Sequence, residues 1–220
     1  MLRLARFTLA ALCLSCATPP SSAEPETPTS KPSGNLDVPW PTEALPAVKA
    51  LYAGSWKPQE PLGFEQALFD EAGLLSLPKN MMAGRRRWSG FRSYGEQMLV
   101  DTQIEPRKGP AMAYTWWLLT WDQVVGPPET DLSAVIHFRH RGRARVWLDG
   151  QLLFDEQPTE AGTWQTLQRA VMLTGSDDVF LVKTARGSPE LGPSANFELR
   201  VSAPQGEALD GQIWQTVRVW

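Results

Sequence analysis

The chain has 220 residues, 42% hydrophobic and 20% charged, so it is long enough to bury the core of one globular domain. Its 21 basic and 24 acidic residues give a formal net charge of −3, which excludes a general electrostatic attraction to nucleic acid. Two cysteines, Cys13 and Cys16, and two histidines, His137 and His140, are too few for a disulfide framework, a thiol enzyme or a cysteine-rich zinc site. We therefore expect no metal and no cofactor.

The N-terminus has the order of a secretory signal peptide. Arg3 and Arg6 precede an apolar run over residues 7–14, and small residues follow it. The run is shorter than the roughly 20 apolar residues of a membrane-spanning helix. Residues 1–15 are therefore predicted to be a signal peptide, and no transmembrane helix is expected.

The end of this signal, Leu12-Cys13-Leu14-Ser15-Cys16, resembles the lipobox of bacterial lipoproteins. In that family the signal is cut before a cysteine that is then acylated, and a small residue such as Ser15 precedes the cut. The usual leucine three residues before the cysteine is replaced here by Cys13, and an ordinary signal peptide cut after Ala17 or Ala23 is the alternative. The resemblance implies lipidation of Cys16 and sorting to the outer membrane, where two acyl chains give stable anchoring.

The next segments are predicted to be a tether and an extension. Ten of the 19 prolines lie between residues 17 and 61, and the stretch 16–35 is too polar to bury a core, which predicts a disordered tether. Residues 36–80 are more apolar, and the spacing within Glu43–Tyr52 and Phe64–Ala72 predicts two short helices. This partly helical extension is expected to dock on the domain that follows.

Residues 81–220 show the pattern of strands and turns. The clearest signal is Arg145–Phe154, in which Asp149-Gly150 joins two β-rich runs, as in a type I′ hairpin that pairs Val146 with Leu153 and Trp147 with Leu152. Other strands are predicted over residues 113–121, 135–138, 165–173, 179–183, 197–201 and 213–219. This density of strands predicts an all-β fold, an antiparallel jelly-roll β-sandwich.

Several of these segments are similar to those of galactose-binding-like and PA14-like jelly rolls. The similarity covers about residues 113–202 and rests on Val146-Trp147-Leu148-Asp149-Gly150, Val179–Lys183 and Asn196–Val201. It implies the fold more than the function. Where PA14-like lectins carry adjacent aspartates that bind calcium, this chain has His140-Arg141-Gly142-Arg143, so no calcium-dependent sugar site is expected. The pair Asp177-Asp178 lies in another loop and is interpreted as a solvated turn, because hard cations need six or more converging oxygens.

Two groups of residues are candidates for binding. Trp117 and Trp121 share one face of a predicted strand, either as core or as a sugar-stacking or partner surface, with the core interpretation favoured. Arg139, Arg141, Arg143 and Arg145 alternate, so they share a strand face or gather round a turn at Gly142. Guanidinium groups suit phosphate or carboxylate. A solvated hairpin tip is the favoured interpretation of these arginines, with the anion-binding patch as the alternative.

No catalytic motif occurs in the sequence: it lacks Gly-x-Ser-x-Gly, His-Glu-x-x-His and a phosphate-binding glycine loop. The sequence therefore predicts a lipid-anchored envelope protein that is not an enzyme, whose sandwich acts as an interaction or scaffold module for other envelope proteins. A carbohydrate-binding surface lipoprotein is the alternative, and a glycan-processing enzyme is the least favoured. We expect an outer-membrane location, a membrane contact through the lipid, and no nucleic acid partner.

Overall fold

The structure is a computed structural model that describes residues 36–44, 46–47, 49–56, 63–75, 82–83, 86–92, 96–104, 109–121, 131–158, 162–174 and 177–215. The predicted signal peptide, the tether and Cys16 lie outside the described residues. Two 3-10 turns occur, η1 (Gly63–Glu65) and η3 (Val100–Thr102). The strands are β1 (Lys49–Trp56), β2 (Met82–Ala83), β3 (Arg86–Arg87), β4 (Ser89–Arg92), β5 (Ala111–Trp121), β6 (Leu132–His140), β7 (Arg143–Leu148), β8 (Gln151–Glu156), β9 (Gln165–Leu173), β10 (Asp178–Arg186), β11 (Phe197–Ser202) and β12 (Gln212–Gln215).

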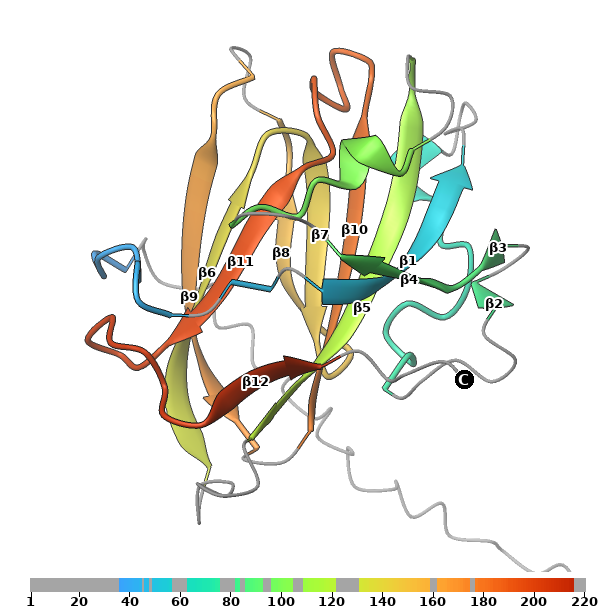
Figure 1. Ribbon diagram of the computed structural model, residues 1–220. Coiled ribbons are helices and arrows are strands. Elements are labelled where there is room, and N and C mark those ends of the chain that lie inside the picture. Colours follow the sequence, from blue (N-terminus) through green and yellow to red (C-terminus); the bar gives the residue numbers. More distant parts are fainter. Residues whose placement is uncertain are drawn as a thin grey trace, which may run out of the picture. The chain divides into compact units, whose positions relative to one another are not determined.

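Two antiparallel sheets form a sandwich (Figure 1). The larger sheet has the order β4-β1-β5-β10-β7-β8, with β12 also paired to β5, and the smaller sheet has the order β11-β6-β9. The short strands β2 and β3 pair only with each other within the described chain. This arrangement confirms the predicted all-β sandwich. A strand lies at five of the six predicted positions, and β12 covers residues 213–215 of the sixth, whose remaining residues lie outside the described chain.

The main hydrophobic core lies between the two sheets, where side chains of both sheets meet. Trp117 from the larger sheet stacks against Phe197 from the smaller one, with ring centroids 6.0 Å apart, and both are fully buried. Phe138 of the smaller sheet stacks on Phe154 of the larger one at 5.8 Å. Burial of such large aromatic surfaces is the main stabilising term of the fold.

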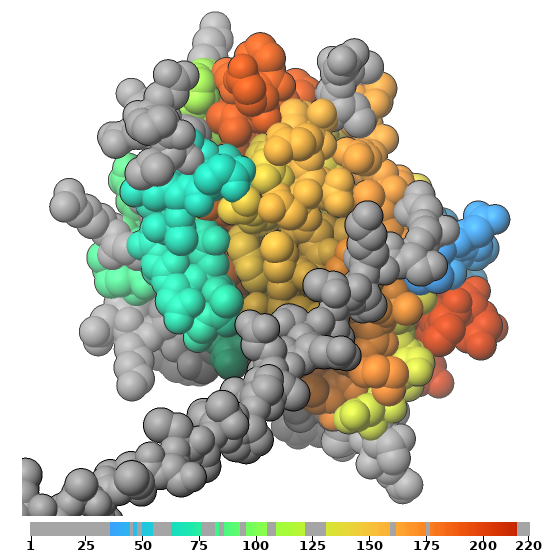
Figure 2. All heavy atoms as spheres, turned by 180° about the vertical axis from the view of Figure 1, so that it is seen from behind, coloured from blue at the N-terminus to red at the C-terminus, as the bar shows by residue number. Residues whose placement is uncertain are grey.

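The larger sheet is also covered on its outer face. Tyr114 and Trp116 project from β5 away from the core and form a second cluster with Leu68, Phe69 and Leu74. These three residues belong to the segment 63–75, which we call the strap. Figure 2 shows the strap in teal beside the hairpin β7–β8 in yellow and orange. The strap therefore packs on the outer face of the larger sheet.

The helices predicted in the extension are wrong. Within Glu43–Tyr52 the structure has the start of β1, which lies between β4 and β5 in the larger sheet. Alternate residues of β1 enter different clusters, with Ala50 and Tyr52 in the inter-sheet core and Leu51 on the outer face. A strand buried on both faces is apolar at most positions, so its spacing also matches a helical stripe. Residues 49–56 are thus part of the sandwich.

Within Phe64–Ala72 the structure has only the end of η1 followed by irregular chain and turns. A turn after Asp70 is closed by a 3.0 Å hydrogen bond from the Gly73 N–H to Asp70 Oδ1. The strap lies along the sheet, where Leu68, Phe69 and Leu74 pack against it and Glu65 and Glu71 form ion pairs with its basic residues.

The hairpin β7–β8 has the predicted turn. Asp149 and Gly150 both have positive φ, 47° and 77°, as a type I′ turn requires. Trp147 pairs with Leu152 as predicted, but Val146 pairs with Phe154 instead of Leu153, because a β-bulge shifts the register.

The turn at Gly142 carries the chain from the smaller sheet to the larger one. A Cβ at Gly142 would lie 2.2 Å from the Ser194 carbonyl oxygen and 2.3 Å from that of Ala185, so only glycine fits. On the other side of the molecule, residues 36–44 cross the outer face of the smaller sheet (Figure 1). There the Arg200 guanidinium donates to the carbonyl oxygens of Pro41, Thr42 and Ala44, each at 2.9 Å.

Candidate functional site

The two tryptophans singled out in the sequence belong to the core. Trp117 has no exposed surface and packs between Phe180, Phe197 and Trp214. Trp121 is partly buried against the same core. The strand is apolar on both faces because it lies between two layers, so a ligand-binding role for Trp117 is wrong: no ligand can reach it in this fold.

The four alternating arginines do not form one patch. Arg139 lies in β6 of the smaller sheet, and its guanidinium stacks 3.7 Å above the ring of Trp40. Arg141 lies in the connecting turn, where its Nε donates to the Gly162 carbonyl oxygen at 2.8 Å. Its guanidinium is also 5.8 Å from the ring of Trp164, which is 36% exposed. The crossover at Gly142 separates these two side chains from the other two arginines.

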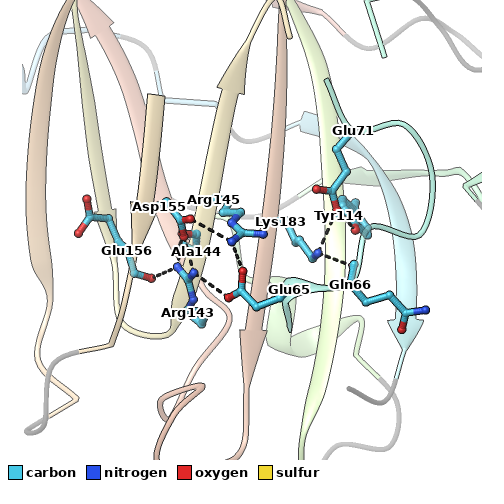
Figure 3. Close-up of polar contacts among 10 residues, drawn as sticks. All are labelled: Glu65, Gln66, Glu71, Tyr114, Arg143, Ala144, Arg145, Asp155, Glu156 and Lys183. Carbon is cyan, nitrogen blue, oxygen red and sulfur yellow. Dashed lines mark hydrogen bonds and ion pairs between the residues drawn. The ribbon is translucent and has the colours of Figure 1, made fainter. Parts of the chain in front are cut away.

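Arg143 and Arg145 lie on the outer face of the larger sheet, where the strap covers them (Figure 3). Glu65 of the strap and Asp155 of β8 both form ion pairs with both arginines. The Arg143 Nη2 to Glu65 Oε1 distance is 3.0 Å, as is that from Arg145 Nη2 to Asp155 Oδ2. Arg143 Nη1 also donates to the Glu156 carbonyl oxygen at 2.8 Å.

Lys183 of β10 lies next to this group and belongs to the same face. Its ammonium group is fully buried and donates to Glu71 Oε1 at 2.9 Å and to the Gln66 carbonyl oxygen at 2.8 Å. The Tyr114 hydroxyl donates to the same Glu71 oxygen (Figure 3). The ring of Phe64 faces the three cations, with its centroid 4.7 Å from the Arg143 Cζ and 4.8 Å from the Lys183 Nζ.

The charges in this cluster balance. Three cations, Arg143, Arg145 and Lys183, meet three carboxylates, two of which come from the strap. Partial burial would raise the pKa of Glu65, but the hydrogen bonds from Arg143 and Arg145 outweigh it and hold that pKa below its usual value. Burial lowers the pKa of Lys183, against the attraction of Glu71. The prediction that Arg143 and Arg145 present a guanidinium patch to an external anion is therefore wrong, since the chain's own carboxylates occupy them.

The loop with Asp177 and Asp178 also differs from its interpretation as a solvated turn. Asp177 is exposed, but Asp178 is fully buried and accepts hydrogen bonds from the Thr174 N–H and hydroxyl through Oδ1, both at 2.9 Å. Burial raises the pKa of Asp178 and of Asp149, which faces it. Among the described residues, no group of three or more His, Cys, Asp or Glu side chains is placed to hold a metal ion.

The sandwich is open on the side where both sheets end, at β8 and at β9. A hollow of about 390 Å³ lies there, which we call the β8–β9 groove. Its walls come from the hairpin and from β9: Leu148, Asp149, Gln151, Leu153, Arg169, Ala170, Val171 and Met172. Met172, at 56% exposure, is the most exposed large apolar side chain of the described residues, and Leu152 on the same hairpin is 43% exposed.

The residues that matter most at these sites were not singled out in the sequence. Lys183 carries a signal, because it ends a predicted strand whose other four residues, 179–182, are all apolar. Arg169 carries another, because it alternates with Leu167 and Val171 and so takes a core-facing position in its strand. Glu65 and Glu71 carry none, since only the tertiary structure places the strap over the sheet.

No protein-family model matches the chain, and no protein of curated function matches it. Among solved structures it is similar to a β-glucosidase from Kluyveromyces marxianus in complex with glucose, with 10% identity, a TM-score of 0.43, and 71% of this chain and 16% of the other covered. An anti-sigma factor domain-containing protein is similar at 14% identity and a TM-score of 0.39, over 76% of this chain and 46% of the other. A family 35 carbohydrate binding module from Clostridium thermocellum is similar at 18% identity and a TM-score of 0.29, over 42% of this chain and 71% of the other. This chain thus spans less than a fifth of the glucosidase, and likenesses at these scores carry no argument about function.

Proposed function

We propose that this protein is a lipid-anchored component of the bacterial cell envelope, held at the outer membrane by acyl chains on Cys16. The support is the order of charged, apolar and small residues over 1–15 and the lipobox-like sequence that ends at Cys16. Among the described residues, the structure contains no helix of the length and apolarity needed to cross a membrane.

We further propose that the sandwich is a non-catalytic binding module whose partner is another envelope protein. The β8–β9 groove is the observation that supports this function. The outer face of each sheet is crossed by the chain's own segments, the strap on one and residues 36–44 on the other. The open side instead carries a hollow lined in part by Met172, whose side chain is exposed on the outer face of β9, and exposed apolar surface is typical of interaction sites.

The anchor is tested by fractionating cells that express the wild type or Cys16→Ser. We expect the wild type in the membrane fraction and the variant in the soluble fraction, and an acyl mass on the N-terminal peptide of the wild type alone. If both forms are soluble, the lipid anchor is wrong.

The binding module is tested by photo-crosslinking in cells, with the crosslinking residue placed at Met172. A crosslinker at Thr166, an exposed position of the same strand, is the matched control. We expect Met172 to capture a defined envelope protein that Thr166 does not capture. Identical capture at both positions, or none at Met172, would contradict the proposed surface.

Carbohydrate binding is a second candidate function. The observation that favours it is that the groove combines the carboxylate of Asp149, the amide of Gln151 and the guanidinium of Arg169 with apolar walls. Such mixed walls suit a polyhydroxylated ligand better than a purely apolar one.

A further inference from the structure

Strand β9 has an open edge. All nine of its residues pair with β6 on one side, and in the part of the chain that the structure describes no strand pairs with its other side (Figure 1). Such an edge presents unpaired backbone N–H and C=O groups, with which a further extended segment can pair. The smaller sheet therefore has a place for a fourth strand beside β9.

Both faces of this edge have room for further side chains. Arg169 and Val171 project on the core-facing side, where the β8–β9 groove of about 390 Å³ lies. On the outer side, Ala170 and Met172 are exposed. A small ligand held in the groove would leave the outer side uncovered. An added strand would cover both sides, because its side chains alternate between the two faces as those of β9 do.

Arg169 determines which strand fits. It alternates with Leu167 and Val171, both of which pack against the inter-sheet core, so its side chain leaves β9 on the core-facing side. The guanidinium carbon lies 5.4 Å from the centre of the Phe154 ring. An inward-pointing charge disfavours pairing with a wholly apolar strand, because that strand would bury the guanidinium without a partner. A strand that places a carboxylate opposite Arg169 removes this cost.

The guanidinium of Arg169 has donors available for such a carboxylate. Among the described residues, no side chain or carbonyl accepts a hydrogen bond from it, and its contacts are the Phe154 ring and the attraction of Glu156. A carboxylate accepts two parallel N–H···O bonds from an arginine fork. Once an added strand covers the groove, this pair is shielded from water, so it distinguishes an acidic strand from a basic one.

The chain's own sequence does not supply this strand. β9 contains no acidic residue, so the β9 of a second copy brings no carboxylate to Arg169. Residues 17–35 carry several prolines, which lack the N–H that a paired strand donates. Residues 216–220 include Arg218 and no acidic residue. The charge and the backbone therefore favour a segment of a separate protein.

We propose that the half of β9 from Arg169 to Leu173 receives an extended segment of the partner protein as a fourth strand of the smaller sheet. The segment pairs its backbone with the open edge, places a glutamate or aspartate next to Arg169, and lays an apolar side chain beside Met172 on the outer face. The inference rests on the proposed protein-binding function. It gives the partner a chemistry, an extended apolar segment with one inward carboxylate.

The test titrates the full-length lipidated protein in detergent with a fluorescent peptide of the sequence Thr-Val-Val-Glu-Val-Val-Thr. Its glutamate shares one face with two valines, so the three side chains enter the groove together. We expect a Kd of about 1 mM or tighter, and binding about tenfold weaker or less when lysine replaces the glutamate. Hydrogen exchange of the backbone amides within residues 165–173 should slow in the complex.

Arg169→Glu should reverse the preference, so that this variant binds the lysine peptide more tightly than the glutamate peptide. Such a gain of affinity excludes unfolding as the cause of the change. Arg92→Glu makes the same change of charge at an exposed position of β4, at the far edge of the larger sheet, and should keep the wild-type preference.

Backbone pairing is tested with two further peptides, each N-methylated at alternate residues along one edge of the strand. One should bind as the parent peptide does and the other should not, because an added strand pairs through only one of its own edges.

The inference is overturned if no peptide binds, if lysine and glutamate peptides bind equally, or if the two methylated peptides behave alike. Crosslinking at Met172 separates it from the wider function. An envelope protein captured there while no peptide binds refutes only the added strand, whereas no capture and no peptide binding refute both proposals. Capture of a second copy of this chain would overturn the assignment to a separate protein.

Discussion

The Lys183 ammonium nitrogen lies 2.9 Å from the Glu71 carboxylate oxygen, and the lysine side chain has no exposed surface. Lys183 lies in strand β10 of the larger sheet and Glu71 lies in the strap. This ion pair therefore joins two residues that are 112 positions apart in the sequence. Removing one member of a buried pair leaves the other charge without compensation, which is far more costly than removing both.

The first prediction follows from this pair. Glu71→Gln leaves the Lys183 ammonium buried without its carboxylate, so we expect a loss of about 3–5 kcal/mol in the free energy of unfolding, measured by urea denaturation. Lys183→Met leaves the Glu71 carboxylate, whose side chain is only 9% exposed, without its cation, so we expect a loss of similar size, and the double variant should cost less than the sum of the two. Losses that simply add in the double variant would show that the ion pair does not fasten the strap.

The second prediction concerns pH and His137. Burial lowers the pKa of His137 from 6.5 to about 4, and the nearby positive charges of Arg139 and Arg200 contribute a smaller part of this shift. The unfolded chain therefore binds more protons between these two values, and stability falls as the pH decreases from about 6.5 towards 4. Between pH 7 and pH 5 we expect a loss of about 2 kcal/mol from this group.

His137→Gln is the control for this prediction, because glutamine does not titrate. Its side-chain amide keeps an N–H donor for the Ser202 hydroxyl oxygen, which lies 2.7 Å from His137 Nε2. The difference in unfolding free energy between wild type and variant should shrink as the pH falls through this window. A difference that is independent of pH would contradict the assigned pKa of His137.

The third prediction concerns Asp178 and Asp149. The raised pKa values of both carboxyl groups mean that their ionisation destabilises the folded state once the pH is above their unfolded values. Asp178→Asn keeps Oδ1 as acceptor for Thr174 and replaces the second oxygen by a donor that faces Asp149. We expect it to stabilise the protein by about 1 kcal/mol at neutral pH and to have little effect near pH 3.

Asp177→Asn is the matched control for this variant, because Asp177 is exposed and its neighbour is not. Thermal unfolding of both variants at the two pH values decides the matter. A lower stability of Asp178→Asn at neutral pH would show that the ionised pair is compensated in the folded protein.

The fourth prediction tests the position of the tryptophans. Trp117→Ala opens a cavity in the inter-sheet core, and we expect a loss of about 3–5 kcal/mol in the free energy of unfolding. Trp164→Ala removes a side chain that is 36% exposed, and the expected loss is about 1 kcal/mol or less. Similar losses at the two positions, measured by urea denaturation, would place Trp117 outside the core.

The sequence by itself determined the sandwich. The two-residue alternation and the Asp149-Gly150 turn are local signals, since a strand pleat and a type I′ turn depend on neighbouring residues only. The same local signals misidentified β1 as a helix, because a strand buried on both faces loses the alternation that marks it.

The tertiary structure alone decided which polar groups meet. Glu65 reaches Arg143 and Arg145 from the strap, and nothing in the local sequence around the arginines records this partner. The crossover at Gly142 likewise divides four arginines that look like one patch along the chain. The β8–β9 groove exists only because two edge strands that are not paired with each other end on the same side, an arrangement that depends on sheet order and not on residue pattern.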